Sequence, residues 1–269
     1  MRTCSFLLAL AGLALAPLAA QAQQAQPAQD DAIDPDRPDF TEGTGIVPLG
    51  RVQVETGVTY SRVDEERTTA LGEVLVRVPL SKRVEARIGV GSYDWIHHNG
   101  PSSQGYEDPE IGVKVQVAGG GDDKPAGLAS ALAHPAVALL FLTTVPVGGH
   151  DLTADAWQPT AKLALGWELT KRFSLSSNLN LANLADGSRR FSQVAASLSA
   201  GYSLTERLDS FFEVFAFSRE AAGGPSTRYA DTGVAYAVTD NLKLDFRVGC
   251  GRNDAHPDYF VGTGAAFRW

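Results

Sequence analysis

Hydrophobic and polar residues alternate one by one through most of the chain after Gly50. The first of these stretches carries Val52, Val54, Thr56, Val58 and Tyr60 on one face and Gln53, Glu55, Gly57 and Thr59 on the other. A period of two is typical of β-strands with one apolar and one polar face. About twelve such stretches run up to the C-terminus, each near the ten residues that a tilted membrane strand needs. The pattern predicts an all-β, antiparallel protein.

Short turns of similar sequence join alternate pairs of these strands. They read LSKR at 80–83, LTKR at 169–172, LTER at 204–207 and VTDN at 238–241. Each turn closes one strand and opens the next, so all four lie at one end of the predicted sheet. Longer connections are expected at the other end, at 61–70, 94–108, 147–156, 184–190, 218–228 and 251–258. One long connection, 118–134, falls on the short-turn side, and its GLASALA stretch is compatible with a small helix.

Alternation alone fits a lipocalin-like barrel, a sandwich or a membrane barrel, because all three pair an apolar face with a polar one. An even strand count, with short turns at one end and long loops at the other, favours an antiparallel transmembrane β-barrel. The aromatic last residue also favours it. Trp269 and Phe267 on the apolar face resemble the signal that the outer-membrane barrel assembly machinery recognises. Because lipid offers no partner to a free strand edge, the last strand should pair with the first, near 51–60.

The polar face carries opposite charges in the middle of strands, where a membrane barrel would turn them into its lumen. These candidate lumen-lining residues are Glu55, Glu73, Arg77, Glu85, Arg87, Lys114, Lys162, Glu168, Asp245 and Arg247. They would set selectivity if a path through the barrel exists. The alternative is a salt-bridge network that only holds the barrel in shape.

The N-terminus has the features of a secretory signal peptide. A positive start at Met1-Arg2, an apolar run at 6–18 and a small-x-small site at 20–22 predict a cleaved signal over residues 1–22. Residues 23–50 show no periodicity and are expected to form a periplasmic N-terminal segment or partial plug, followed by the barrel at 51–269. Cleavage leaves Cys250, expected as a small buried hydrophobe. The net charge of −8 gives no footprint for nucleic-acid binding.

No enzyme motif stands out in the chain. It contains no HExxH, GxSxG, CxxC or P-loop pattern, and no cofactor or metal site is predicted. A lipid hydrolase at the barrel rim would need a His–Ser pair, for which His98 with Ser102 or Ser103 is the only nearby candidate. No orienting acid is visible beside it.

Several motifs together resemble one family of outer-membrane proteins. They are DRPDFTE at 36–42, GRVQVETG at 50–57, LGEVLVRV at 71–78, GYSLTERL at 201–208, LDFRVGCGRNDA at 244–255 and the terminal YFVGTGAAFRW. The combination is similar to the family "putative MetA-pathway of phenol degradation". The resemblance implies a bacterial outer-membrane location and uptake of small aromatic or hydrophobic solutes, with a link to phenol degradation. It supplies no catalytic residues.

The first of these motifs precedes the first strand and therefore belongs at the short-turn, periplasmic end of the barrel. Its candidate plug residues are Asp36, Arg37, Pro38, Asp39 and Phe40. Three functions are compatible with the sequence: a channel or transporter, a closed structural or ligand-binding barrel, and a rim lipid hydrolase. The expected partners are outer-membrane lipid, the barrel assembly machinery and a small hydrophobic or aromatic solute, with no nucleic acid.

Overall fold

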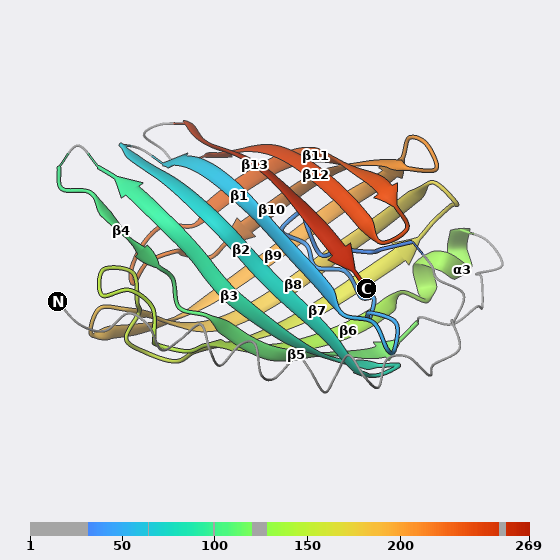
Figure 1. Ribbon diagram of the computed structural model, residues 1–269, viewed down its shortest axis with the longest axis horizontal. Coiled ribbons are helices and arrows are strands. Elements are labelled where there is room, and N and C mark those ends of the chain that lie inside the picture. The colour runs from blue at the N-terminus through green and yellow to red at the C-terminus, as the bar shows by residue number, and fades with distance from the viewer. Residues whose placement is uncertain (1–31, 64, 99, 120–127, 253–256) are drawn as a thin grey trace.

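The computed structural model describes residues 32–63, 65–98, 100–119, 128–252 and 257–269. The predicted signal peptide lies outside the described residues. Within them, thirteen strands form a single antiparallel sheet, and there is one short helix outside it (Figure 1). The elements are β1 (Gln53–Val63), β2 (Glu66–Ser81), β3 (Val84–His97), β4 (Ser103–Tyr106), β5 (Glu110–Ala118), α3 (Leu128–Ala133), β6 (Ala136–Thr144), β7 (Gln158–Glu168), β8 (Phe173–Asp186), β9 (Arg189–Ser203), β10 (Leu208–Phe217), β11 (Thr227–Thr239), β12 (Leu242–Arg252) and β13 (Pro257–Arg268).

The sheet closes on itself through its first and last strands. β1 pairs with β13 from Gln53 opposite Arg268 to Arg62 opposite Tyr259. Beyond that ladder, Val52 and Trp269 exchange two backbone hydrogen bonds, of 3.0 and 3.1 Å. β4 and β5 both pair with β3, one after the other, so the wall has twelve strand positions. The predicted twelve-strand barrel and its β1–β13 closure are confirmed.

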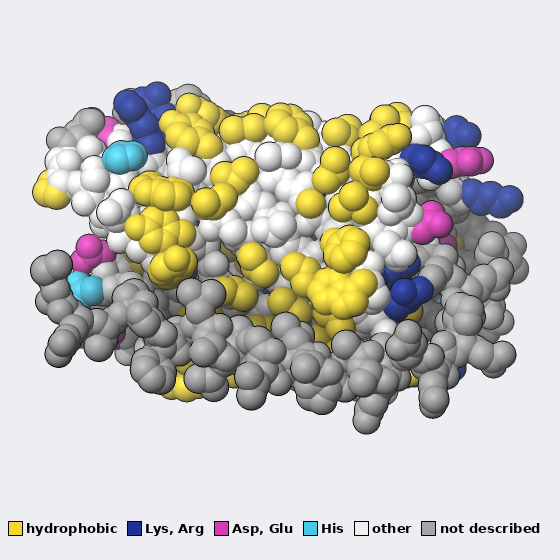
Figure 2. All heavy atoms as spheres, in the orientation of Figure 1, with side chains coloured by type: hydrophobic (Ala, Val, Ile, Leu, Met, Phe, Trp, Pro, Cys, Tyr) yellow, Lys and Arg dark blue, Asp and Glu magenta, His cyan; other side chains and the backbone are white. Residues whose placement is uncertain are grey.

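The two faces of the wall show which side is wet. Many large apolar side chains are exposed on the outer face, such as Phe246 at 47% and Trp269 at 50% exposure. Figure 2 shows hydrophobic side chains across the middle of the molecule and charged ones toward its two ends. Inside, charged side chains are fully buried, with Glu55 and Lys114 at 0%. This inverted arrangement is that of a membrane barrel.

Two connections differ from their predicted lengths. Only two residues separate β1 from β2, and two separate β8 from β9, where long loops were expected at 61–70 and 184–190. These strands instead continue past the band of exposed apolar side chains on the outer face, here called the apolar belt. The small helix expected in 118–134 is present as α3, but it is not long and apolar enough to span a membrane, and the described residues contain no other helix. Cys250 is exposed on the outer face, so the expectation of a buried cysteine was wrong.

A bulge in β2 and β3 changes which residues face inward. Gly72, Glu73 and Gly91 have positive φ values of 109°, 41° and 78°, and the β2–β3 register shifts between Leu71 and Val74. Before the bulge, even-numbered residues of β3 such as Ile88 face outward and are exposed. After Gly91, Ser92 and Asp94 are buried instead. The bulge thus turns one polar pair of side chains into the barrel.

Candidate functional site

The N-terminal segment of residues 33–47 lies inside the barrel and crosses from one wall to the other (Figure 1). At the short-turn end, Ile33 N–H donates to the carbonyl of Asp240 at 2.9 Å. Farther along, the N–H of Phe40 donates to Glu213 on β10 at 2.7 Å. Val47 N–H donates to Glu85 on β3 at 2.9 Å. Inward-facing carboxylates therefore satisfy backbone groups that have no strand partner.

Asp36 is the centre of an ion-pair cluster between the segment and the wall. Its carboxylate lies 3.4 Å from Arg77, 2.6 Å from Arg87 and 2.8 Å from Lys114, which come from β2, β3 and β5. Burial raises the pKa of Asp36, but the charges of Arg77, Lys114 and Arg87 outweigh burial and hold that pKa well below its usual value. Asp36 therefore stays ionised and tied to three strands.

Arg37, the next residue of the segment, makes a second set of contacts with the wall. Its guanidinium pairs with Glu73 on β2 at 2.8 Å and with Asp245 on β12 at 3.4 Å. It lies against the wall where Gly57 and Gly264 stand side by side, and a Cβ on either glycine would overlap it. Two facing glycines thus make the space for this side chain.

Glu42 ties the far end of the segment to the wall. It pairs with Lys162 on β7 and, at 3.1 Å, with Arg87 on β3. Burial raises the pKa of Glu42, but the charges of Lys162 and Arg87 outweigh burial and lower that pKa to about 2. The N–H of Glu42 also donates to Asn178 on β8 at 2.7 Å.

Between these charged contacts, Phe40 enters an aromatic cluster on the inner wall. Its ring stacks on Phe215 at 4.7 Å between centroids and meets Phe217 edge-on at 5.3 Å. Tyr229 stacks on the same Phe215 at 5.0 Å, and Phe260 lies 6.5 Å from it. The lumen therefore holds one apolar surface, and a ring of the segment covers part of it.

Asp39 faces the carboxylates of Glu213 and Asp231 rather than a cation. Burial and the charge of Glu213 raise the pKa of Asp39 well above its usual value, although Ser199 donates a hydrogen bond to it. Asp231 is buried, and its carboxyl group lies beside that of Glu213. This part of the interior is therefore rich in carboxylates and poor in cations.

Nine of the ten candidate lumen residues lie on the inner wall and contact the segment or its charged partners. Asp36 and Arg37 gather most of them, Glu42 holds Lys162, and Arg247 donates to the carbonyl of Pro38 at 2.8 Å. Glu168 stands apart, exposed at the end of β7. Glu213, Asp231 and Asn178 also contact the segment or its surroundings but were not among the predicted lumen residues. Their positions in the alternation of β10, β11 and β8 could have found them. A role of these residues in selectivity stays a prediction.

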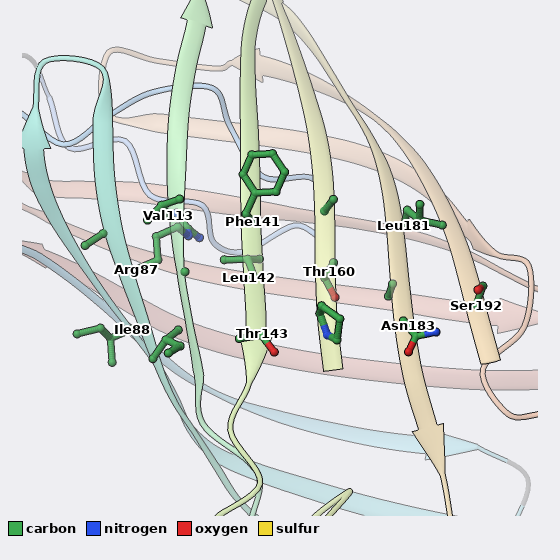
Figure 3. Close-up of a pocket in the computed structure, with 16 residues that line it drawn as sticks. Arg87, Ile88, Val113, Phe141, Leu142, Thr143, Thr160, Leu181, Asn183 and Ser192 are labelled. Atoms are coloured by element: carbon green, nitrogen blue, oxygen red, sulfur yellow. The ribbon is translucent and has the colours of Figure 1, made fainter. Parts of the chain in front are cut away.

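A wide hollow in the structure lies outside this interior. It measures about 840 Å³ and is bordered by exposed apolar side chains of the outer face, among them Ile88, Val113, Phe141 and Leu181 (Figure 3). It therefore belongs to the lipid-facing surface. A second hollow of about 440 Å³ is polar and lies inside, where Glu42 of the segment and Arg87 of the wall border it.

Sequence comparison now assigns this barrel to a family. Residues 35–269 match the family described as "Putative MetA-pathway of phenol degradation". The chain belongs to this family. The search of curated proteins found no sequence that matches this chain.

Two solved structures resemble this family member in fold. One is the COG4313 outer membrane channel from Pseudomonas putida F1, with a TM-score of 0.65, 10% identity, and coverage of 91% of this chain and 100% of that one. The other is the KdgM porin in complex with disordered oligogalacturonate, with a TM-score of 0.52, 10% identity, and coverage of 80% and 98%. At this identity the likeness shows a shared outer-membrane barrel fold.

Proposed function

We propose that this family member is an outer-membrane channel for small solutes, closed in the present conformation by its own N-terminal segment. The observation that carries the proposal is the path of residues 33–47 through the lumen. Ion pairs and hydrogen bonds hold the segment to β2, β3, β5, β7, β10 and β12. Irregular backbone at membrane depth is tolerated where it is enclosed by protein or lines a cavity. Movement of such a segment would open a path.

For the solute we propose a small aromatic or hydrophobic compound. The family description names phenol degradation. Phe40 and Tyr229 both stack on Phe215 inside the lumen, so a planar ring could stack there in the place of Phe40. A solute that stacks there would compete with Phe40 and favour release of the segment.

Single-channel conductance of the refolded full chain in a planar bilayer tests the channel. Deleting residues 36–42 removes the contacts of Asp36, Arg37, Phe40 and Glu42, so we expect larger and more frequent conductance steps than in the intact chain. Deleting residues 24–30 is the matched control, because it shortens the N-terminus by the same amount and leaves these contacts in place. Equal conductance of the two deletions would contradict the proposed plug.

A closed barrel without transport is the second candidate function. The buried charges around Asp36 favour it, because an interior filled with ion pairs is costly to open. If the intact chain and the 36–42 deletion are both silent while their gel mobility shows a folded barrel, the lumen charges serve as scaffold.

We further propose that the protein is not an enzyme and that residues 1–22 are removed on export. At the rim, the structure brings His97 rather than His98 to Ser102, with 3.0 Å between Nδ1 and Oγ. His98 lies 3.5 Å from Glu66, and both of these side chains are about half exposed. Phospholipid turnover should be absent from the purified protein and unchanged by His97→Ala. The mass of the mature protein tests the cleavage.

A further inference from the structure

The polar hollow of about 440 Å³ lies between the N-terminal segment and the bulged part of the wall. Glu42 of the segment borders it on one side. Residues of β2 and β3, the connection 107–109 between β4 and β5, and the first residue of β5 border it on the other. β3 runs from the short-turn end toward the long-loop end, and Asp94 follows Arg87 along it. The hollow therefore lies on the long-loop side of the Asp36 ion pairs, where a solute from outside would arrive before the segment.

Carboxylates outnumber cations around this hollow. Its lining contains six acidic residues and one cation, Arg87. Four of the six accept ion pairs or hydrogen bonds: Glu42 with Lys162 and Arg87, Glu73 with Arg37, Asp108 with the N–H groups of Gly148 at 2.8 Å and Ala154 at 3.0 Å, and Glu107 with the hydroxyl of Ser92 at 2.7 Å. The other two are Asp94 and Glu110. Within the described part of the chain, Asp94, Glu107 and Glu110 form no ion pair with Lys, Arg or His.

Asp94 contributes a buried carboxylate to this hollow. The residue is 6% exposed, and its Oδ1 atom is buried with no hydrogen bond of normal geometry to it among the described residues, while Ser92 and Glu107 lie beside its carboxyl group. It faces inward only because the bulge at Gly91 reverses the alternation of β3. A buried unpaired carboxylate oxygen is costly, so a cationic ligand at this position would be stabilised.

A single metal ion does not fit this arrangement. Among the described residues, no three His, Cys, Asp or Glu side chains are grouped so that they could hold one. The carboxylates instead surround a space within the range of about 300–1,000 Å³ that small-molecule sites occupy. The same interior already holds an organic cation in this way, since the guanidinium of Arg37 lies between Glu73 and Asp245.

We propose that this hollow, centred on Asp94, Glu107 and Glu110, binds a small organic cation carrying an ammonium or guanidinium group. The binding site stands on its own geometry. Its use in selecting solutes rests on the proposed channel function. In that channel, the cation site would add a preference for positively charged solutes that the aromatic cluster around Phe215 does not provide.

Binding to the folded full chain in detergent micelles tests the proposal without requiring transport. The probes are butylammonium, butanol and butyrate, which share a similar chain and differ in charge, and NMR line broadening during titration gives Kd. We expect butylammonium to bind most tightly. The double substitution Asp94→Asn with Glu107→Gln should raise its Kd about tenfold or more, because two charged hydrogen-bond acceptors are lost. Glu110→Gln alone provides a milder test if the double variant does not fold.

Glu168→Gln is the matched control, because Glu168 lies at an inward position of the alternation but outside the hollow. Its Kd should equal that of the unchanged protein. Equal binding of butylammonium and butyrate, or an unchanged Kd in both folded variants, would overturn the proposal. Displacement of the amine by calcium at much lower concentration would also overturn it in favour of a metal site. Binding without conductance would leave this site standing and count against the channel, and conductance without binding would do the reverse.

Discussion

Asp36 joins cations from three separate strands, and its removal would leave Arg77, Arg87 and Lys114 buried beside one another. We expect Asp36→Ala to lower the free energy of unfolding by about 3–5 kcal/mol, as for other broken buried ion pairs. Urea titration of the refolded barrel, followed by gel mobility, measures this. Asp209→Ala breaks the more exposed pair with Lys243 and should cost about 1 kcal/mol or less. Similar losses for the two variants would show that the Asp36 cluster contributes little.

The pKa of Asp39 is shifted in the opposite direction to those of Asp36 and Glu42, so Asp39 makes the free energy of unfolding depend on pH in the opposite sense. Because the pKa of Asp39 is raised in the folded state, its stabilising contribution is present at low pH and is lost as pH rises through that pKa. The lowered pKa values of Asp36 and Glu42 keep both ionised from pH 5 to 9, so they add no dependence there.

The neutral variant Asp39→Asn should therefore gain stability relative to the unchanged protein as pH rises from 5 to 9. Urea midpoints of the two proteins across this range measure the difference. A constant difference would mean that Asp39 does not titrate against Glu213 and Asp231.

At this scale the sequence predicted which charges face inward but not how they pair. Alternation placed Arg77 and Asp245 on the polar face. Their partners Asp36 and Arg37 come from a segment without periodicity, and Arg37 and Asp245 are 208 residues apart. Pairing over such distances depends on barrel closure and on the path of the segment, and neither leaves a local pattern.

Among the elements, the bulge at Gly91 is the one on which the acidic hollow depends. Gly91 has a φ of 78°, and a Cβ there would lie 2.8 Å from the carbonyl oxygen of Glu107. We expect Gly91→Ala to destabilise the barrel by about 1–3 kcal/mol. Alanine disfavours the positive φ at this position, and its Cβ would press against the backbone of Glu107, which lies between β4 and β5. Urea unfolding measures the effect. Gly100→Ala, with no atom within 4 Å of the added Cβ, should leave stability unchanged, and equal effects would contradict this account.

This bulge could not be predicted from the sequence, because glycine permits a positive φ without requiring one. The long loops predicted at 61–70 and 184–190 are also wrong, because the strands continue there. The residues there are polar because these strand ends lie beyond the lipid and need no apolar face. Alternation of hydrophobicity therefore reports the membrane-embedded part of a strand better than its full length.

For the molecule as a whole, the outer apolar belt fixes how the barrel sits in lipid. Phe246 lies near the middle of β12 and is exposed on this belt. Phe246→Arg should cost about 2–4 kcal/mol near the bilayer midplane, whereas Leu204→Arg, in a turn at the barrel end, should cost about 0–1 kcal/mol. Urea titrations of folding into lipid vesicles measure both. Equal costs would mean that the belt does not contact lipid where the exposed side chains indicate.

The architecture was the most predictable level, because a closed barrel needs only the alternation, an even strand count and the turn positions. Phe267 and Trp269 occupy the outer face as expected, with their rings stacked at 5.5 Å. Their recognition by the assembly machinery stays a prediction, since it depends on a partner and not on this fold.

The β1–β13 pairing also constrains how the protein is made. The strand that completes the ring, β13, comes after every other described strand in the chain, and its partner β1 is the first. Any chain that stops before residue 257 is therefore an open sheet with two unpaired edges, ready to join the edges of other chains. The N-terminal segment can be shortened without opening the ring, but the C-terminus cannot. Premature termination should thus yield aggregates for degradation and never a smaller barrel.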